Sequence, residues 1–138
     1  MDNKKLIAGF GYQEGRISSW DGKRTYTQAV PQMAKHCCDN GVDEILVYDW
    51  SVTDEDHEAA IAVIKAVCRE ADAPVIAGGR VKRMEDVKKY LYAGASAVFL
   101  DMGKEENKDM IKEASDRFGK EKIYAYLPTD DYLDSVKD

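Results

Sequence analysis

The sequence is poor in cysteine and histidine, and neither residue type is spaced for a structural site. Its 138 residues contain three cysteines and two histidines. Cys37, Cys38 and Cys68 are odd in number and two of them are adjacent, which argues against a disulfide framework. No CxxC spacing or histidine pair accompanies them, so the sequence predicts no metal site and no cofactor. We expect buried or half-buried thiols in a reducing compartment, and we expect His36 and His57 on helix surfaces.

Long apolar runs, a targeting segment and an excess of positive charge are also missing. No apolar run approaches the ~20 residues of a membrane-spanning helix, and Met1–Lys5 lacks a signal-peptide pattern. The formal net charge is −6 with no basic stripe to offset it, which argues against a nucleic-acid partner. A phosphorylated small molecule remains compatible, because backbone N–H groups can bind an anion locally on an acidic protein. We therefore expect a cytoplasmic protein.

Five short apolar runs predict β-strands. Their apolar residues are continuous rather than alternating, as in Ile45–Tyr48. Continuous runs are typical of strands that are covered on both faces, as in parallel sheets. The expected strands are Lys5–Phe10, Glu44–Asp49, Pro74–Ala77, Ala97–Leu100 and Lys122–Leu127.

Amphipathic segments between these runs predict helices. In Asp54–Ala71 the apolar residues form one stripe at helical spacing, and Ser51 or Thr53 precedes it as a cap. The alternation of strand and helix predicts repeated βαβ units with right-handed crossovers, and hence a parallel sheet. The other expected helices are Gln28–Asp39, Met84–Ala93, Lys108–Phe118 and a short terminal helix capped by Thr129.

Candidate ligand-binding residues follow the expected strands, because ligands of parallel α/β folds gather at the strands' C-terminal ends. After the third strand, Gly78 and Gly79 let the backbone approach an anion, and Arg80 adds a charge-assisted contact to a phosphate. The alternative is that the glycines only form the turn and that Arg80 is solvated. Asp49 and Asp101 form an acid–base pair if their strands bring them to one rim; otherwise each caps the segment that follows.

The two tryptophans and a charged turn remain open to more than one interpretation. Trp20 and Trp50 are either loop anchors or parts of a ligand-facing patch, and Asp21–Arg24 is most simply an exposed turn.

Several segments resemble two histidine-biosynthesis barrels, the cyclase subunit of imidazole glycerol phosphate synthase and the phosphoribosyl-formimino imidazole carboxamide isomerase. Leu6–Ile17 resembles their opening strand and loop, and Gly41–Asp49 their second strand. Pro74–Val81, followed by Glu85–Val87, resembles their third strand and phosphate loop. Ala93–Ala95 and Arg117–Gly119 also match. The resemblance spans nearly the whole chain and covers slightly more than the first half of the family's barrel.

The departures concern the residues that carry the family's chemistry. The resemblance implies a catalytic aspartate at the end of strand one, where this chain has Gly11, and another at the end of strand five, where it has Pro128. Neither glycine nor proline can transfer a proton. Asp130 or Asp131 could replace the second acid after a loop shift. Arg80 stands in place of the third glycine of the phosphate loop.

For the fold, we expect one α/β domain over residues 1–138, a parallel (βα)5 unit like the first half of a TIM barrel, on its own or leading a longer barrel. The alternative is an open, flavodoxin-like doubly wound sheet in the order 2-1-3-4-5. Similarity favours the half-barrel, whereas a length below the roughly 200 residues of a complete barrel suits the open sheet.

For function, the resemblance implies a binding or assembly module that is not catalytic by itself and retains one phosphate site. The alternative is a cyclase or isomerase that acts on phosphoribosyl imidazole carboxamide intermediates of histidine biosynthesis, using Asp49 or Asp101. The expected partners are a phosphorylated small molecule, and a second copy or a fused or associated protein of the same pathway. A receiver-like signalling domain is disfavoured, because Gly9–Tyr12 lacks the acids expected after its first strand.

Overall fold

Strand order decides between the two expected α/β arrangements. The computed structural model describes residues 6–13, 16–18, 20, 25–26, 32, 35 and 38–127. Its strands β1 (Ile7–Gln13), β4 (Glu44–Asp49), β5 (Val75–Gly78), β6 (Ala97–Asp101) and β7 (Ile123–Tyr126) are parallel, and each pairs with the next along the chain. A flavodoxin-like sheet would place the second parallel strand outside the first. The half-barrel prediction is therefore confirmed, and the open-sheet alternative is wrong.

A short antiparallel hairpin extends this sheet beyond β1. β2 (Arg16–Ser18) pairs with the end of β1, and β3 (Thr25–Tyr26) pairs with β2, which gives the order β3-β2-β1-β4-β5-β6-β7. The sequence did not predict this hairpin, because strands of three and two residues are too short to form an apolar run.

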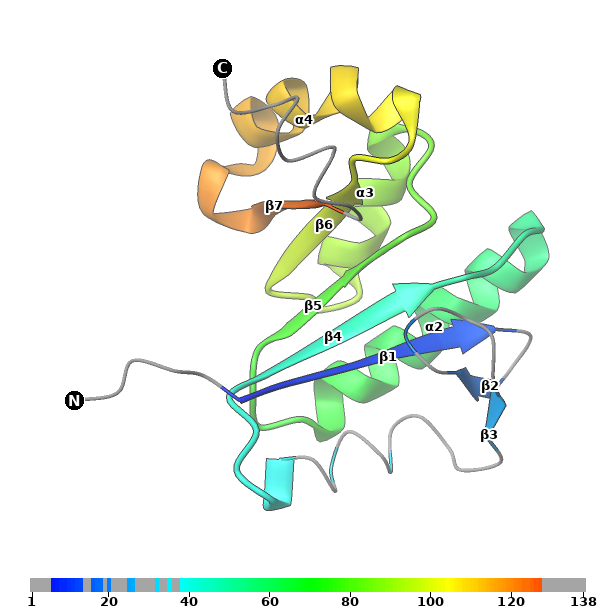
Figure 1. Ribbon diagram of the computed structural model, residues 1–138, viewed down its shortest axis with the longest axis vertical. Helices are drawn as coiled ribbons and strands as arrows, with labels where there is room; N and C mark the ends of the chain where they lie inside the picture. Colours follow the sequence, from blue (N-terminus) through cyan, green and yellow to red (C-terminus); the bar gives the residue numbers. More distant parts are fainter. Residues whose placement is uncertain are drawn as a thin grey trace.

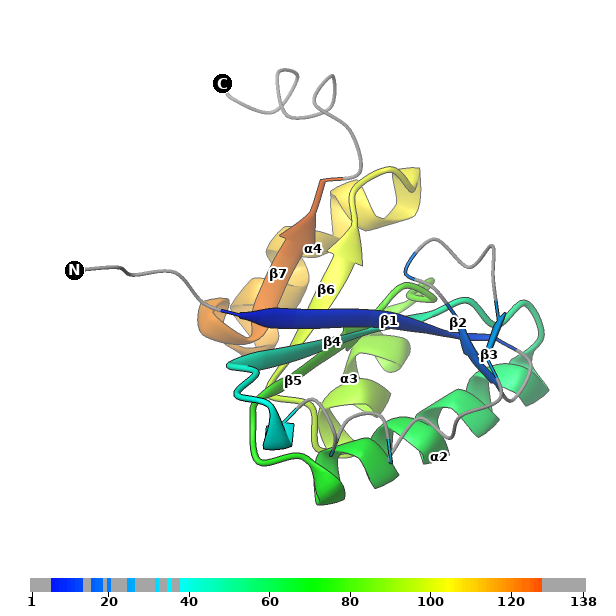
Figure 2. The ribbon, with the colours of Figure 1, turned by 60° about the horizontal axis from the view of Figure 1, so that its bottom comes forward.

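The helices lie together on one face of the twisted sheet, as Figures 1 and 2 show. They are α2 (Asp54–Glu70), α3 (Met84–Tyr92) and α4 (Glu105–Phe118), followed by a 3-10 turn, η1 (Lys120–Lys122). All three were predicted, although α4 begins three residues earlier than expected. The expected helix Gln28–Asp39 lies largely outside the described residues, and the expected terminal helix lies wholly outside them.

The larger core fills the space between the helices and the outer face of the sheet. At the start of α2 the Thr53 side chain accepts a hydrogen bond from the Asp56 N–H, at 3.1 Å, which fixes where the helix begins. The apolar stripe of α2 then packs on the strands. Core residues that are buried here include Ile45, Val47, Ala60, Ile64, Val67, Ala77, Val87, Val98 and Leu100.

A second, aromatic cluster covers the inner face of the sheet. We call it the inner aromatic cluster, and it consists of buried Tyr48, Ile76, Ala97 and Phe99 with half-buried Trp20, Leu46, Trp50 and Tyr126. This face corresponds to the interior of a barrel, which is usually filled by branched aliphatic side chains. Here large rings fill it instead.

Two further expectations concern the cysteines and membrane spans. Cys38 and Cys68 have free, half-buried thiols, as predicted, and burial raises the pKa of the Cys68 thiol. Cys37 lies outside the described residues. None of the described helices is long and apolar enough to cross a membrane.

Candidate functional site

The two candidate carboxylates lie on opposite faces of the sheet. Side chains alternate along a strand, and Tyr48 belongs to the inner aromatic cluster, so Asp49 points outward to the helices. On β6, Phe99 faces inward, and Asp101 accepts a hydrogen bond from the Tyr48 hydroxyl on that same side, at 2.6 Å. The strands thus bring both acids to the C-terminal rim without bringing them together.

Asp49 is the centre of a buried polar network on the outer face. The residue is only 1% exposed. One carboxylate oxygen accepts the Ser51 backbone N–H at 2.9 Å, and the other contacts His57 Nδ1 and the Tyr90 hydroxyl, each at 2.8 Å. Burial, and then the negative charge of Asp49, raise the pKa of Tyr90 well above its ordinary value, so the phenol keeps its proton and donates it.

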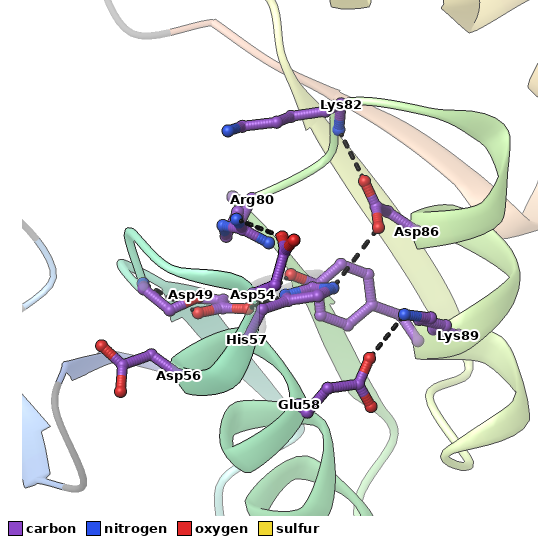
Figure 3. A network of polar contacts seen from close by, with 12 residues as sticks. Asp49, Asp54, Asp56, His57, Glu58, Arg80, Lys82, Asp86 and Lys89 are labelled. Atoms are coloured by element: carbon purple, nitrogen blue, oxygen red, sulfur yellow. Dashed lines mark hydrogen bonds and ion pairs between the residues drawn. The ribbon is translucent and has the colours of Figure 1, made fainter.

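His57 reaches into this network from the first turns of α2, so its expected surface position is wrong. The residue is 2% exposed, and Figure 3 shows it between Asp49 and Asp86. Its Nε2 lies 3.5 Å from Asp86 Oδ1 and forms no hydrogen bond. The second Asp86 oxygen accepts the backbone N–H groups of Lys82 and Arg83, at 2.9 and 3.2 Å. The sequence carried a usable signal, because His57 lies three residues before Ala60 on the buried stripe of α2.

Arg80 is buried at 7% exposure and turns toward α2. Its guanidinium donates to the Asp54 carboxylate at 2.9 Å and to the Val52 carbonyl at 3.2 Å, whereas its Nε has no partner. The hydrogen bond from Arg80 holds the pKa of the exposed Asp54 below its usual range. Lys104 approaches the same loop and donates to the Gly79 carbonyl at 2.6 Å.

The two glycines before Arg80 lie tightly against aromatic side chains. A Cβ at Gly78 would lie 2.2 Å from the Phe99 carbonyl oxygen and 2.9 Å from its ring. Gly79 has a φ of +108°, and a Cβ there would lie 2.7 Å from the Tyr48 ring. Packing alone therefore requires glycine at both positions, whether or not a ligand binds.

At the C-terminal ends of the strands on the inner face, which we call the inner rim, the Asp101 carboxylate lies beside the inner aromatic cluster. Tyr48 and Trp50 stack with centroids 4.0 Å apart, and the Trp50 indole N–H donates to the Trp20 carbonyl at 2.9 Å. Trp20 lies over the centre of the face, edge-on to Tyr48 and Tyr126. Burial, and then the hydrogen bond to Asp101, raise the pKa of Tyr48. Both tryptophans are thus anchors of the inner aromatic cluster.

The position matched to the family's first catalytic acid lies at this inner face. Gly11 is buried on β1 and pairs directly with Tyr48 on β4. Pro128, Asp130 and Asp131 lie outside the described residues, as do His36 and the turn Asp21–Arg24.

Comparison with known proteins assigns the family. A sequence profile described as "histidine biosynthesis protein" matches residues 13–132. The chain belongs to this family. It is 34% identical over 92 residues to the imidazole glycerol phosphate synthase subunit HisF of Exiguobacterium sp. (strain ATCC BAA-1283 / AT1b), covering 67% of this chain and 36% of that protein. It is 29% identical over 137 residues to HisF of Staphylococcus aureus (strain Newman), covering 97% and 53%.

This histidine-biosynthesis chain therefore spans about half the length, or less, of the HisF proteins that it matches. Among solved structures it is similar to dihydropteroate synthase (FolP) from Thermus thermophilus, with a TM-score of 0.56 and 14% identity. That likeness covers 82% of this chain and 41% of the other, and it concerns the fold alone.

Proposed function

We propose that this chain is a binding and assembly module of the histidine-biosynthesis family that does not catalyse by itself. The proposal rests on the number of carboxylates at the inner rim. Among the strand ends that the structure describes, only β6 brings a carboxylate, Asp101, to the inner face. The matched position on β1 is Gly11, and family chemistry requires two carboxylates that face each other across the substrate.

The assembly part of the proposal is supported by the length of the relatives and by the inner face. HisF is named as a subunit, and this chain matches 53% of the Staphylococcus protein. The rings of Trp20, Trp50 and Tyr126 are only half-buried on the face that a barrel encloses. We infer that residues 1–138 form one (βα)5 domain, and that a second copy or an associated or fused protein of the pathway supplies the remaining barrel units.

We also propose that the segment Gly78–Arg80 holds one phosphate group, with Lys104 as an additional cation. The backbone N–H groups of Lys82 and Arg83 already donate to Asp86 and are not available to a phosphate. We therefore assign the positive charge that would bind the phosphate to side chains. Arg80 has an unpartnered Nε, and Lys104 Nζ lies at the Gly79 carbonyl. A lysine can leave one carbonyl contact to form a stronger, charge-assisted bond with phosphate.

Calorimetric titration with inorganic phosphate and with a phosphoribosyl imidazole carboxamide tests this site. We expect saturable binding that weakens at least tenfold in Lys104→Ala. The matched control is Lys112→Ala, because Lys112 is an exposed residue of α4 whose ammonium lies 3.8 Å from the Asp116 carboxylate. Equal affinities in the wild type and both variants would contradict the role of Lys104. No binding in the wild type would remove the phosphate site from the proposal.

A working cyclase or isomerase is the second candidate, and the half-buried Asp101 favours it. Its carboxylate is held by the Tyr48 hydroxyl and by the Gly103 N–H at 2.9 Å, on the face where a substrate would lie. If the chain turns over a pathway intermediate, Asp101→Asn should abolish the rate while the protein stays folded. Asp116→Asn, on the exposed side of α4, is the control. Turnover in the wild type that Asp101→Asn removes would overturn the non-catalytic proposal.

A further inference from the structure

The loop between β5 and α3 is fixed by side chains of its own chain. In this loop, residues 80–83, the Lys82 and Arg83 N–H groups donate to one Asp86 carboxylate oxygen, at 2.9 and 3.2 Å. Tyr90 and Asp86 are both buried on α3, at 0% and 3% exposure. Lys82 and Arg83 are themselves exposed, but their acceptor Asp86 is buried, so these two bonds fix how the loop enters α3.

His57 lies between Asp86 and a second buried carboxylate, that of Asp49. On one side its Nδ1 contacts the same Asp49 oxygen that accepts the Tyr90 hydroxyl, each at 2.8 Å. On the other side its Nε2 faces Asp86 Oδ1 at 3.5 Å. Figure 3 shows the imidazole between the two carboxylates, with Lys82 farther away on the other side of Asp86. Of the other charged groups labelled in Figure 3, Glu58 and Lys89 pair with each other at the surface, and Asp54 pairs with Arg80.

We propose that His57 is a positioning residue for the loop 80–83, although it bonds to no residue of that loop. It faces Asp86, which holds the Lys82 and Arg83 N–H groups, and on its other side it contacts Asp49, which also binds Tyr90. The consequence for phosphate affinity rests on the proposed function, because Arg80 is part of the proposed site. The effect of His57 on the loop does not depend on the proposed function.

Two conservative variants separate the two sides of the imidazole. In His57→Asn the amide nitrogen stands near the place of Nδ1, so the contact with Asp49 is kept and the one with Asp86 is lost. In His57→Gln the longer side chain reaches the place of Nε2, so the contact with Asp86 is kept. Amide hydrogen exchange of the full chain, measured by NMR, reports on the Asp86 side through the Lys82 and Arg83 N–H groups.

We expect at least tenfold faster exchange of the Lys82 and Arg83 amides in His57→Asn, which loses the contact with Asp86. In His57→Gln, which keeps that contact, we expect both amides to exchange near the wild-type rate. The Ile45 and Ser96 amides, which bond to the Pro74 and Val75 carbonyls, are the internal controls. If exchange at the two control amides speeds up equally, His57 only stabilises the fold as a whole. If exchange of the loop amides is unchanged, His57 does not position the loop. Either result overturns the proposal.

Phosphate titration of the same variants separates this inference from the proposed function. If the wild type binds phosphate, we expect severalfold weaker binding in His57→Asn, and unchanged affinity alongside faster loop exchange would overturn the link between loop and ligand. If the wild type binds no phosphate, the proposed site fails, and the exchange data still decide whether His57 positions the loop.

Discussion

At the scale of single residues, alternating small and large side chains build the inner face. Gly11 pairs with Tyr48, Tyr48 with Gly78, and Gly78 with Phe99 across four neighbouring strands. Tyr48 therefore lies between two glycines and Phe99 lies beside one, and the glycines leave the room that these rings occupy. The Gly11 that replaces a matched family acid belongs to this row.

Gly78→Ala should destabilise the protein by about 2–3 kcal/mol, which is in the range of overpacking in a core. The added Cβ would lie 2.2 Å from a backbone oxygen of Phe99, which cannot move without disturbing β6. Urea unfolding measures the change in the free energy of unfolding. Gly9→Ala is the control, because a Cβ there meets the Trp20 ring at an easier 3.3 Å. Equal effects of the two substitutions would contradict the packing argument.

At the scale of elements, one buried acid attaches two helices to the same strand. Asp49, at the end of β4, binds His57 from α2 and Tyr90 from α3. The contact between the helices themselves, Lys89 with Glu58, is exposed and contributes little by comparison. The buried bonds to Asp49 therefore attach both helices to the end of β4, in addition to their apolar packing on the sheet.

Tyr90 makes this attachment sensitive to alkaline pH. Its pKa is raised in the folded state, so its contribution to stability is complete below the unfolded value of about 10 and is lost as the pH rises above it. We expect the free energy of unfolding to fall above pH ~10, and to fall less steeply in Tyr90→Phe, which also loses about 1 kcal/mol at neutral pH. Denaturant titrations from pH 7 to ~11 give both quantities.

The control for this titration is Tyr92→Phe, because Tyr92 lies on the same helix and is 78% exposed. Its pH profile should follow the wild type. A Tyr90→Phe profile that also follows the wild type would show that Tyr90 does not cause the alkaline loss.

Sequence patterns located the elements more reliably than the orientation of their polar residues. Glu44–Asp49 was predicted with the observed bounds of β4, because its apolar run ends at a charged residue. The same continuous run gave no alternation, so it could not show that Asp49 faces the helices while Tyr48 faces inward. The burial of His57 was detectable from helical spacing, whereas the contact of Arg80 with Asp54 joins the loop after β5 to the first residue of α2 and has no local signal.

At the scale of the whole molecule, the chain combines a conventional outer layer with an unusual inner one. The helices cover the outer face as they would in a complete barrel (Figure 2). On the inner face, Trp20 is carried from the segment after β2 onto the sheet, where its indole N–H donates to the Tyr126 hydroxyl at 3.3 Å. A half-barrel with such a ring over its inner face hides apolar surface that the second half of a barrel would otherwise cover.

The sequence has only two tryptophans, and both belong to this one cluster. The intrinsic fluorescence of the chain therefore comes almost entirely from the inner face. Any molecule that covers this face, whether a small ligand or a second half-barrel, should change the emission wavelength or quench it, whereas binding to the outer helices should leave the spectrum unchanged. The protein thus carries its own optical probe for the inner face of the sheet.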